Sequence, residues 1–188
     1  MSVKHPKAAY LFALIGAVGL IVSLISLWVP VKAQLAQYLL ESSWDHYQQT
    51  GENRKPWPWA DHHTVAQIQV PRLGLKQIVL AGDSGRSLAF APGVNERTDI
   101  NGSAMVISGH RDTHFRFLEH LTVNDPIFLI LSSGRREFKV VGYEIIDSQK
   151  SKLNPQRFRN GLILVTCYPF DAVAAGGPLR YVVFARPV

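Results

Sequence analysis

The chain has 188 residues, the length of one domain, and 47% of them are hydrophobic. Its formal net charge is +6, from 20 Lys and Arg against 14 Asp and Glu. The basic residues are scattered, however, and no basic stripe alternates with aromatic side chains, which argues against a nucleic-acid-binding protein. A mild attraction to anionic lipid head groups accounts for this charge.

The first predicted element is a membrane-spanning helix. Residues 8–29 contain no charged side chain, and a run of this length crosses the hydrocarbon core of a bilayer. Tyr10 and Trp28 lie 18 positions apart, roughly 27 Å along a helix, a spacing that places aromatic rings at the two membrane interfaces. We therefore expect a membrane anchor over residues 8–31.

The charges around this segment predict its orientation. Lys4 and Lys7 precede it, and positive residues favour the cytoplasmic side. Residues 1–7 are therefore expected in the cytoplasm and the rest of the chain outside it. A cleaved signal peptide is the alternative, because Val31 and Ala33 fit a small-residue cleavage pattern, but the apolar segment is longer than the usual core of such a peptide.

A helical stalk and a linker are predicted next, over residues 32–56. Leu35 and Leu39 recur at helical spacing, so the helix is expected to continue to about Tyr47. Gly51 and the prolines that follow it then end the helix.

The remaining residues, 57–188, form short strand-like runs separated by turns, without long amphipathic helices. The predicted strands are 65–70, 75–80, 104–108, 126–131, 137–146, 162–168 and 180–185. This pattern predicts an all-β domain, either a barrel or a sandwich. Short helical pieces are expected at 84–90 and 115–121, the second capped by Asp112 or Thr113.

Three strand ends carry reactive side chains. Cys167, the only cysteine, comes two residues before Pro169, which lacks the N–H that a central strand needs, so the thiol is expected where its strand leaves the sheet. A second apolar run ends just before His110, and a third begins at Arg180. Each residue separately has a structural interpretation, as a buried cysteine, a core histidine or a surface arginine. Outside the cytoplasm, a cysteine without a disulfide partner in its chain favours catalysis.

Four short motifs contain or accompany these three residues. They are Trp57-Pro58-Trp59-Ala60-Asp61, Ser108-Gly109-His110-Arg111-Asp112-Thr113-His114-Phe115, Val165-Thr166-Cys167-Tyr168-Pro169-Phe170 and Gly176-Gly177-Pro178-Leu179-Arg180-Tyr181. In content and order they resemble the sortases, membrane-anchored cysteine transpeptidases, and among these the Gram-negative subgroup called class GN. The chain departs from the common Thr-x-Thr-Cys pattern, because Leu164, or Ile163 in another alignment, stands in place of the first threonine.

The resemblance implies a fold, a location and a reaction. The fold is a closed eight-stranded sortase β-barrel with short helices, held in the periplasm by a single helix in the inner membrane. The reaction is cleavage of a C-terminal LPXTG-like sorting signal on a secreted protein, through a thioester on Cys167. The acyl group then passes to an amine acceptor on the cell surface or to water, with no cofactor, metal or nucleic acid.

The residue types suit this chemistry. A thiol is mostly protonated at neutral pH and needs a cationic neighbour to become a nucleophile, which His110 or Arg180 supplies. We expect Arg180 to donate hydrogen bonds to the oxyanion, because a guanidinium stays charged and offers several donors. We expect His110 to protonate the departing amine and deprotonate the incoming one. Asp112 either orients His110 or caps the following turn.

A long connection predicts where the substrate lies. Residues 147–161 form a polar segment too long for a simple turn, and in sortases the equivalent loop forms one wall of the groove for the sorting signal. Leu153 and Phe158 are its two apolar candidates for substrate binding. Thr166 is the third candidate, expected to shape the site through its hydroxyl or backbone.

Other functions fit less well. His62-His63 and the His110/His114 pair supply imidazoles, but no ligand set for a metal is complete. An L,D-transpeptidase would need a Ser-His-Gly-Cys stretch, and a papain-like protease would place its cysteine before its histidine. The non-enzymatic alternative is a membrane-tethered β-barrel module that binds a secreted partner protein, with Cys167 buried.

Overall fold

The computed structural model describes residues 6–95, 104–173 and 176–188. Residues 1–5, which include Lys4 of the predicted cytoplasmic segment, lie outside the described part. The chain forms two compact units, Met1–Tyr38 and Leu39–Val188. The second unit begins well before residue 57, where the sequence predicts the start of the catalytic domain.

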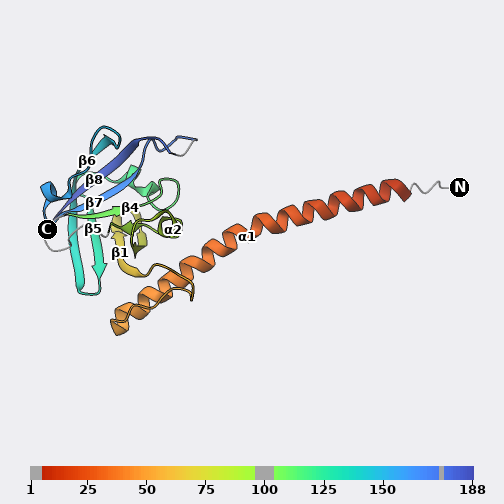
Figure 1. Cartoon of the computed structure of the whole chain (residues 1–188), viewed down its shortest axis with the longest axis horizontal. Helices are drawn as coiled ribbons and strands as arrows, with labels where there is room; N and C mark the ends of the chain where they lie inside the picture. Colours follow the sequence, from red (N-terminus) through yellow and green to blue (C-terminus); the bar gives the residue numbers. More distant parts are fainter. Residues whose placement is uncertain (1–5, 96–103, 174–175) are drawn as a thin grey trace. The chain divides into compact units, whose positions relative to one another are not determined.

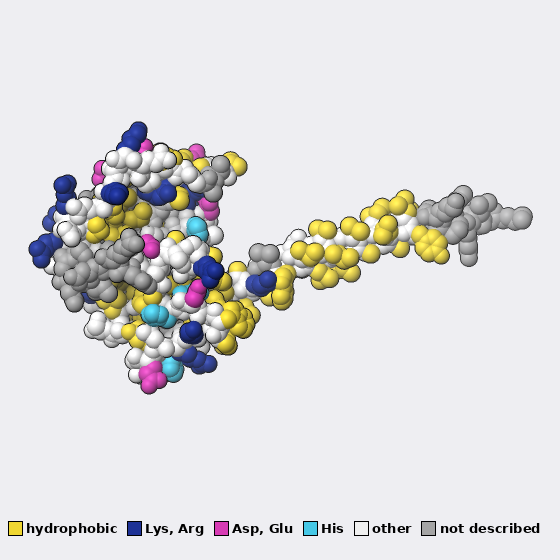
Figure 2. Space-filling view, in the orientation of Figure 1, with side chains coloured by type: hydrophobic (Ala, Val, Ile, Leu, Met, Phe, Trp, Pro, Cys, Tyr) yellow, Lys and Arg dark blue, Asp and Glu magenta, His cyan; other side chains and the backbone are white. Residues whose placement is uncertain are grey.

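Helix α1, Pro6–Thr50, contains both the predicted membrane span and the predicted stalk in 45 continuous residues. Its mean hydropathy reaches 2.5, so by length and composition it can cross a membrane. Figure 2 shows apolar side chains along this helix. The helix ends where Gly51 adopts a φ of +73°, a left-handed conformation that glycine tolerates, and donates its N–H to the Tyr47 carbonyl at 2.9 Å.

The second unit is a closed barrel of eight strands, which confirms the predicted fold (Figure 1). In barrel order the strands are β1 (Thr64–Val70), β2 (Leu75–Ala81), β3 (Gly93–Val94), β4 (Met105–Ser108), β7 (Leu162–Cys167), β8 (Leu179–Pro187), β6 (Gly134–Asp147) and β5 (Pro126–Leu131). The β2–β3 and β4–β7 pairs are parallel, and the other pairs are antiparallel. Strand β3 has only two residues, too few to produce a periodic pattern in the sequence.

Alternating side chains fill the barrel. On β1, Ala66, Ile68 and Val70 are fully buried while the residues between them are half-exposed, because successive side chains of a strand point to opposite faces. Leu162 and Leu164 of β7 join the same interior cluster. The strongly apolar strands of the sequence therefore supply the barrel core.

Strand β7 is also covered on its outer face. There Ile163 and Val165 join a second apolar cluster with Val106 of β4 and Val182 of β8. A strand that is buried on both faces appears in the sequence as a continuous apolar run, which is the pattern of residues 162–167. Its outer face is the one that matters for the site.

Short helices connect the strands. They are η1 (Pro71–Leu73), α2 (Gly85–Leu88), η2 (Arg116–His120) and η3 (Pro155–Phe158). Ser84 caps α2 by accepting a hydrogen bond from the Ser87 N–H. The predicted cap of the 115–121 segment is wrong: Phe115 occupies the N-cap position of η2, without a side-chain cap bond. A fully buried phenylalanine fixes this turn by packing instead.

The last turns of α1 belong to the second unit. Leu40 and Trp44 are almost fully buried and cluster with Ile78, Leu80 and Ala91 of the barrel side. Buried apolar area of this kind is the main favourable term in folding. The stable folded unit therefore includes the residues from Leu39 onward.

Candidate active site

Strands β4 and β7 place two of the predicted catalytic residues at one end of the barrel. The strands are parallel, and Ser108 is directly paired with Val165. His110 and Cys167 each follow their paired residue by two positions. Since parallel strands end on the same side of the sheet, the register places the histidine and the cysteine at neighbouring strand ends.

The third residue lies across the next strand pair. Cys167 and Arg180 are direct partners in the antiparallel register of β7 and β8, and side chains so paired share a face, with Cβ atoms roughly 5 Å apart. That face is the outer one, since alternation groups Cys167 with Val165 and Arg180 with Val182. The thiol is free and half-buried. The register thus places His110, Cys167 and Arg180 at the same end of three neighbouring strands.

A buried side-chain hydrogen bond fixes the ends of β4 and β7 relative to each other. The Thr166 hydroxyl donates to the Gly109 carbonyl at 2.8 Å, and the Gly109 N–H donates to the Val165 carbonyl at 3.1 Å. A Cβ atom at Gly109 would lie 2.7 Å from the Phe115 ring, so only glycine fits there. Thr166 is 2% exposed, so its side chain lies in the interior, where its hydroxyl bonds to Gly109.

The Arg180 side chain is held in place by backbone carbonyls. Its Nη1 donates to the Gly177 carbonyl at 2.6 Å and to the Leu179 carbonyl at 2.9 Å. Both bonds use one nitrogen of a guanidinium that carries five N–H donors. The arrangement orients the group without using all of its donor capacity.

Sequence reasoning missed Arg111, a buried arginine beside the site. Its guanidinium donates to the Pro169 carbonyl at 2.7 Å and the Ala172 carbonyl at 2.8 Å, so it holds the turn that follows Cys167. The Asp112 carboxylate, together with smaller contributions that include Cys167, raises the pKa of Arg111. In the sequence, its position between His110 and Asp112 could have indicated a role near the site.

The partner of Asp112 is Arg111. Its two carboxylate oxygens accept from Arg111 at 2.7 and 2.9 Å, and this hydrogen bonding is the largest cause that lowers the pKa of Asp112. Because Phe115 is the N-cap of η2, Asp112 does not cap that helix. The carboxylate therefore supports the buried arginine.

His114 stands apart from the proposed reaction. It is half-buried, and burial is the largest cause that lowers its pKa, with a smaller contribution from His110. Its Nδ1 lies 3.5 Å from the Gln77 side-chain nitrogen. A neutral imidazole in this position fits a packing role.

The loop between β6 and β7 covers the outer face of the sheet. Leu153 and Phe158 are half-buried and pack against the cluster of Val106, Ile163 and Val182. The Phe158 ring meets the Phe184 ring edge to face, with centroids 5.4 Å apart. These two side chains anchor the loop on the face that carries Cys167, where the loop can form one side of a groove.

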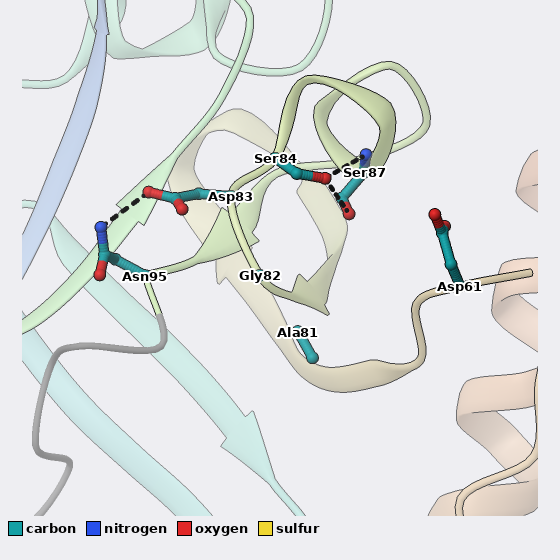
Figure 3. A pocket seen from close by; sticks show the side chains of 7 residues that line it. All are labelled: Asp61, Ala81, Gly82, Asp83, Ser84, Ser87 and Asn95. Atoms are coloured by element: carbon teal, nitrogen blue, oxygen red, sulfur yellow. Dashed lines mark hydrogen bonds between the residues drawn. The ribbon is translucent and has the colours of Figure 1, made fainter.

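Two cavities are lined by residues other than His110, Cys167 and Arg180, although the second includes Phe158. One of about 530 Å³ is lined by Asp61, Ala81, Gly82, Asp83, Ser84, Ser87 and Asn95 (Figure 3). Its polar groups bond to each other, since Asn95 donates to Asp83 at 2.8 Å and Ser84 meets Ser87 at 3.1 Å. The other, of about 460 Å³, lies beside the C-terminal end of β8.

Known proteins are similar to this chain in sequence and in fold. The family model described as "Sortase domain" matches residues 68–188. Sortase D of Bacillus subtilis is 31% identical over 125 residues, which are 64% of this chain and 62% of that protein. The matched stretch thus spans less than two thirds of that relative.

Solved structures agree on the fold. Sortase A from Corynebacterium diphtheriae, as a lid mutant, aligns with a TM-score of 0.59 and 21% identity over 83% of this chain and 91% of that one. A Clostridium perfringens Sortase D5 transpeptidase aligns with a TM-score of 0.60 and 20% identity over 82% and 99%. With the family match over most of the barrel, these likenesses lead to one conclusion: the chain belongs to the sortase family.

Proposed function

We propose that this sortase is a membrane-anchored cysteine transpeptidase that cleaves a C-terminal LPXTG-like sorting signal on a secreted protein. The observation that carries the proposal is the register of β4, β7 and β8, which brings His110, Cys167 and Arg180 to one edge of the outer face. The similarity to a Clostridium perfringens protein described as a transpeptidase supports the reaction class.

The reaction follows from the roles of the three side chains. The Cys167 sulfur attacks the scissile carbonyl carbon, and Arg180 donates hydrogen bonds to the oxyanion that develops. The C–N bond breaks as His110 gives a proton to the departing amine, which leaves a thioester on Cys167. An acceptor amine, or water, then attacks the thioester, and His110 takes its proton. Cys167 leaves as the thiolate, the protonated His110 is restored, and a new amide or acid is released.

The β6–β7 loop supplies the wall of the proposed peptide groove. Leu153 and Phe158 hold the loop against the outer face of the sheet, and their partly exposed surfaces offer apolar contact to the sorting signal. Thr166 acts behind the site, through its bond to Gly109.

The proposed location follows from helix α1 and the charges near its start. The helix anchors the chain in the inner membrane by a single pass, with residues 1–7 in the cytoplasm and the barrel in the periplasm. This placement accompanies assignment to the Gram-negative class GN sortases, which the four motifs of the sequence support. The acceptor is then an amine on the cell surface.

Intact-mass analysis tests the proposal. The full chain in neutral detergent is mixed with a peptide that contains an LPXTG-type signal. The expected result is an added mass equal to the N-terminal peptide fragment, present in the wild type and absent in Cys167→Ala. Added hydroxylamine should release the fragment as its hydroxamate, as expected of a thioester.

The same experiment addresses the binding-module alternative. If a broad peptide panel gives neither adduct nor cleavage, while wild type and Cys167→Ala retain a secreted partner protein equally and intact, the transpeptidase proposal is wrong. A Cys167→Ser variant is a useful matched control, because it replaces only the sulfur by oxygen and is a far weaker nucleophile.

A further inference from the structure

The cavity of about 460 Å³ at the C-terminal end of β8 is unusually basic. Its lining residues are Gln156, Arg157, Phe158, Arg159, Asn160, Arg186 and Pro187. Three of the seven are arginines and none is acidic. Figure 2 shows Lys and Arg side chains on the side of the barrel where Figure 1 places the C-terminus, and others elsewhere on its surface.

The cavity lies at the other end of β7 from Cys167, although Phe158, which holds the loop of the proposed peptide groove, also lines it. Arg186 follows Ala185, which pairs with Leu162 at the start of β7, whereas Cys167 pairs with Arg180 at the other end of the same ladder. Leu162 and Cys167, the two ends of β7, are five positions apart, roughly 17 Å at the usual rise per residue. The reaction proposed at Cys167 therefore gives no role to the three arginines of this cavity.

Two more cations lie beside the cavity. Lys139 of β6 is the direct cross-strand partner of Arg186, and like charges in that position destabilise a sheet. Arg136 donates through Nη2 to the Asn160 carbonyl at 3.3 Å. In the described part of the chain, the Lys and Arg residues that form ion pairs are Arg72, Arg86, Arg111 and Lys150. None of those ion pairs involves a residue that lines the cavity.

One guanidinium of the cavity is positioned by an aromatic ring. Arg186 lies over the Phe158 ring at 5.3 Å from its centroid, and Phe158 in turn packs on Phe184 of β8. A guanidinium held over a ring loses less freedom when it binds an anion, because its orientation is already restricted. The cavity is therefore partly organised for a ligand.

We propose that this cavity binds a phosphate-bearing group. Arginine forks match phosphate oxygens in geometry, and a phosphate presents enough oxygens to meet Arg157, Arg159 and Arg186 together. Its negative charge would also relieve the repulsion between Lys139 and Arg186. The volume exceeds that of the bare anion, so the phosphate is carried on a larger polar molecule, either a lipid head group or a soluble phosphate.

The test uses the full chain in neutral-detergent micelles. Two probes are used: inorganic phosphate, and phosphatidylglycerol incorporated into the micelles in increasing proportion. For both, binding is followed by protection of arginines from phenylglyoxal, read by peptide mass spectrometry. Calorimetry measures the affinity for inorganic phosphate as well. We expect saturable binding that protects Arg157, Arg159 and Arg186 but not the exposed Arg54. The Arg157→Gln/Arg159→Gln variant should weaken binding roughly tenfold or more.

The matched control is Arg54→Gln/Lys55→Gln, which removes the same charge from the exposed linker. Its affinity should equal that of the wild type. Tighter protection by phosphatidylglycerol than by inorganic phosphate assigns the site to a lipid head group, and the reverse assigns it to a soluble phosphate. The proposal is overturned if neither probe saturates, if both double variants weaken binding equally, or if malonate binds as tightly as phosphate.

Discussion

The Thr166 hydroxyl donates a 2.8 Å hydrogen bond to the Gly109 carbonyl. Each of these residues immediately precedes a proposed catalytic residue, Cys167 and His110 respectively. The bond therefore fixes the two strand ends relative to each other. It is made on the buried side of the sheet, where water does not compete for it.

Replacement of Thr166 by valine should reduce turnover while substrate binding changes little. Valine keeps the side-chain shape but cannot donate to Gly109, and a small misplacement of reacting groups costs roughly ten- to a hundredfold in rate. Steady-state kinetics on the sorting-signal peptide should show the loss in kcat. Thr166→Ser, which retains the hydroxyl, should stay within a few-fold of wild type. Equal kcat for Thr166→Val and wild type would contradict the positioning role.

Arg180 should be irreplaceable by lysine. Loss of an oxyanion donor costs roughly 10²- to 10³-fold in kcat, and lysine lacks the planar fork that Gly177 and Leu179 orient. We expect similar losses in kcat/KM for Arg180→Ala and Arg180→Lys, measured by peptide cleavage. Substantial rescue by lysine would instead indicate that a positive charge alone suffices.

Arg111→Met should destabilise the barrel by about 2–3 kcal/mol. The change leaves the Pro169 and Ala172 carbonyls without their donor, and an unsatisfied buried group costs about 1–3 kcal/mol. Urea unfolding followed by tryptophan fluorescence measures the difference. The control is Arg116→Met on the exposed surface of η2, expected within about 0.5 kcal/mol of wild type. Equal stability of the two variants would refute the structural role.

The Arg72–Asp125 pair should make stability depend on acid pH. Hydrogen bonding from Arg72 is the largest cause that lowers the pKa of Asp125 from 3.8 to about 2. Because the folded-state pKa is lowered, the contribution is fully present above 3.8 and is lost as the pH falls towards 2. The stability deficit of Asp125→Asn, measured by urea unfolding, should therefore shrink between pH 5 and pH 2. A deficit that is independent of pH would contradict this linkage.

The end of α1 should contribute to barrel stability. Leu40 is fully buried against the barrel side, and a Leu→Ala change in such a position costs about 2–5 kcal/mol. Leu35→Ala is the matched control on the same helix, since Leu35 is 56% exposed. Chemical unfolding of both full-length variants in neutral detergent should reveal a clear difference. Equal stabilities would mean that the folded unit does not depend on α1.

Most of the fold was predictable because its signals are local. The run of residues 162–167 and the alternation of β1 are visible as apolar patterns, and the uncharged stretch of α1 needs only length and composition. The pairing of β3 was not predictable, since two residues hold no period and the strand exists only through its neighbours. The cap of η2 was mispredicted because a buried Phe115 replaced the side-chain bond.

The candidate site, like the fold, was predictable only in part. The motifs pointed to His110, Cys167 and Arg180 together, through their order and their places at strand ends. They did not reveal that Arg111 holds the turn after Cys167, or that Asp112 pairs with Arg111. The choice of partner for a charged side chain depends on which groups folding brings near it, and adjacent residues offer several candidates.

The sequence by itself determined an apolar N-terminal helix, a series of short strands and three reactive residues at strand ends. Only the tertiary structure decided that these residues lie at the same end of neighbouring strands, because the parallel register of β4 and β7 pairs Ser108 with Val165 across distant parts of the chain. It also decided that Thr166 turns inward to Gly109, while Arg157, Arg159 and Arg186 surround one cavity. Local sequence specifies conformation, but contacts between distant segments depend on how strands pair and pack.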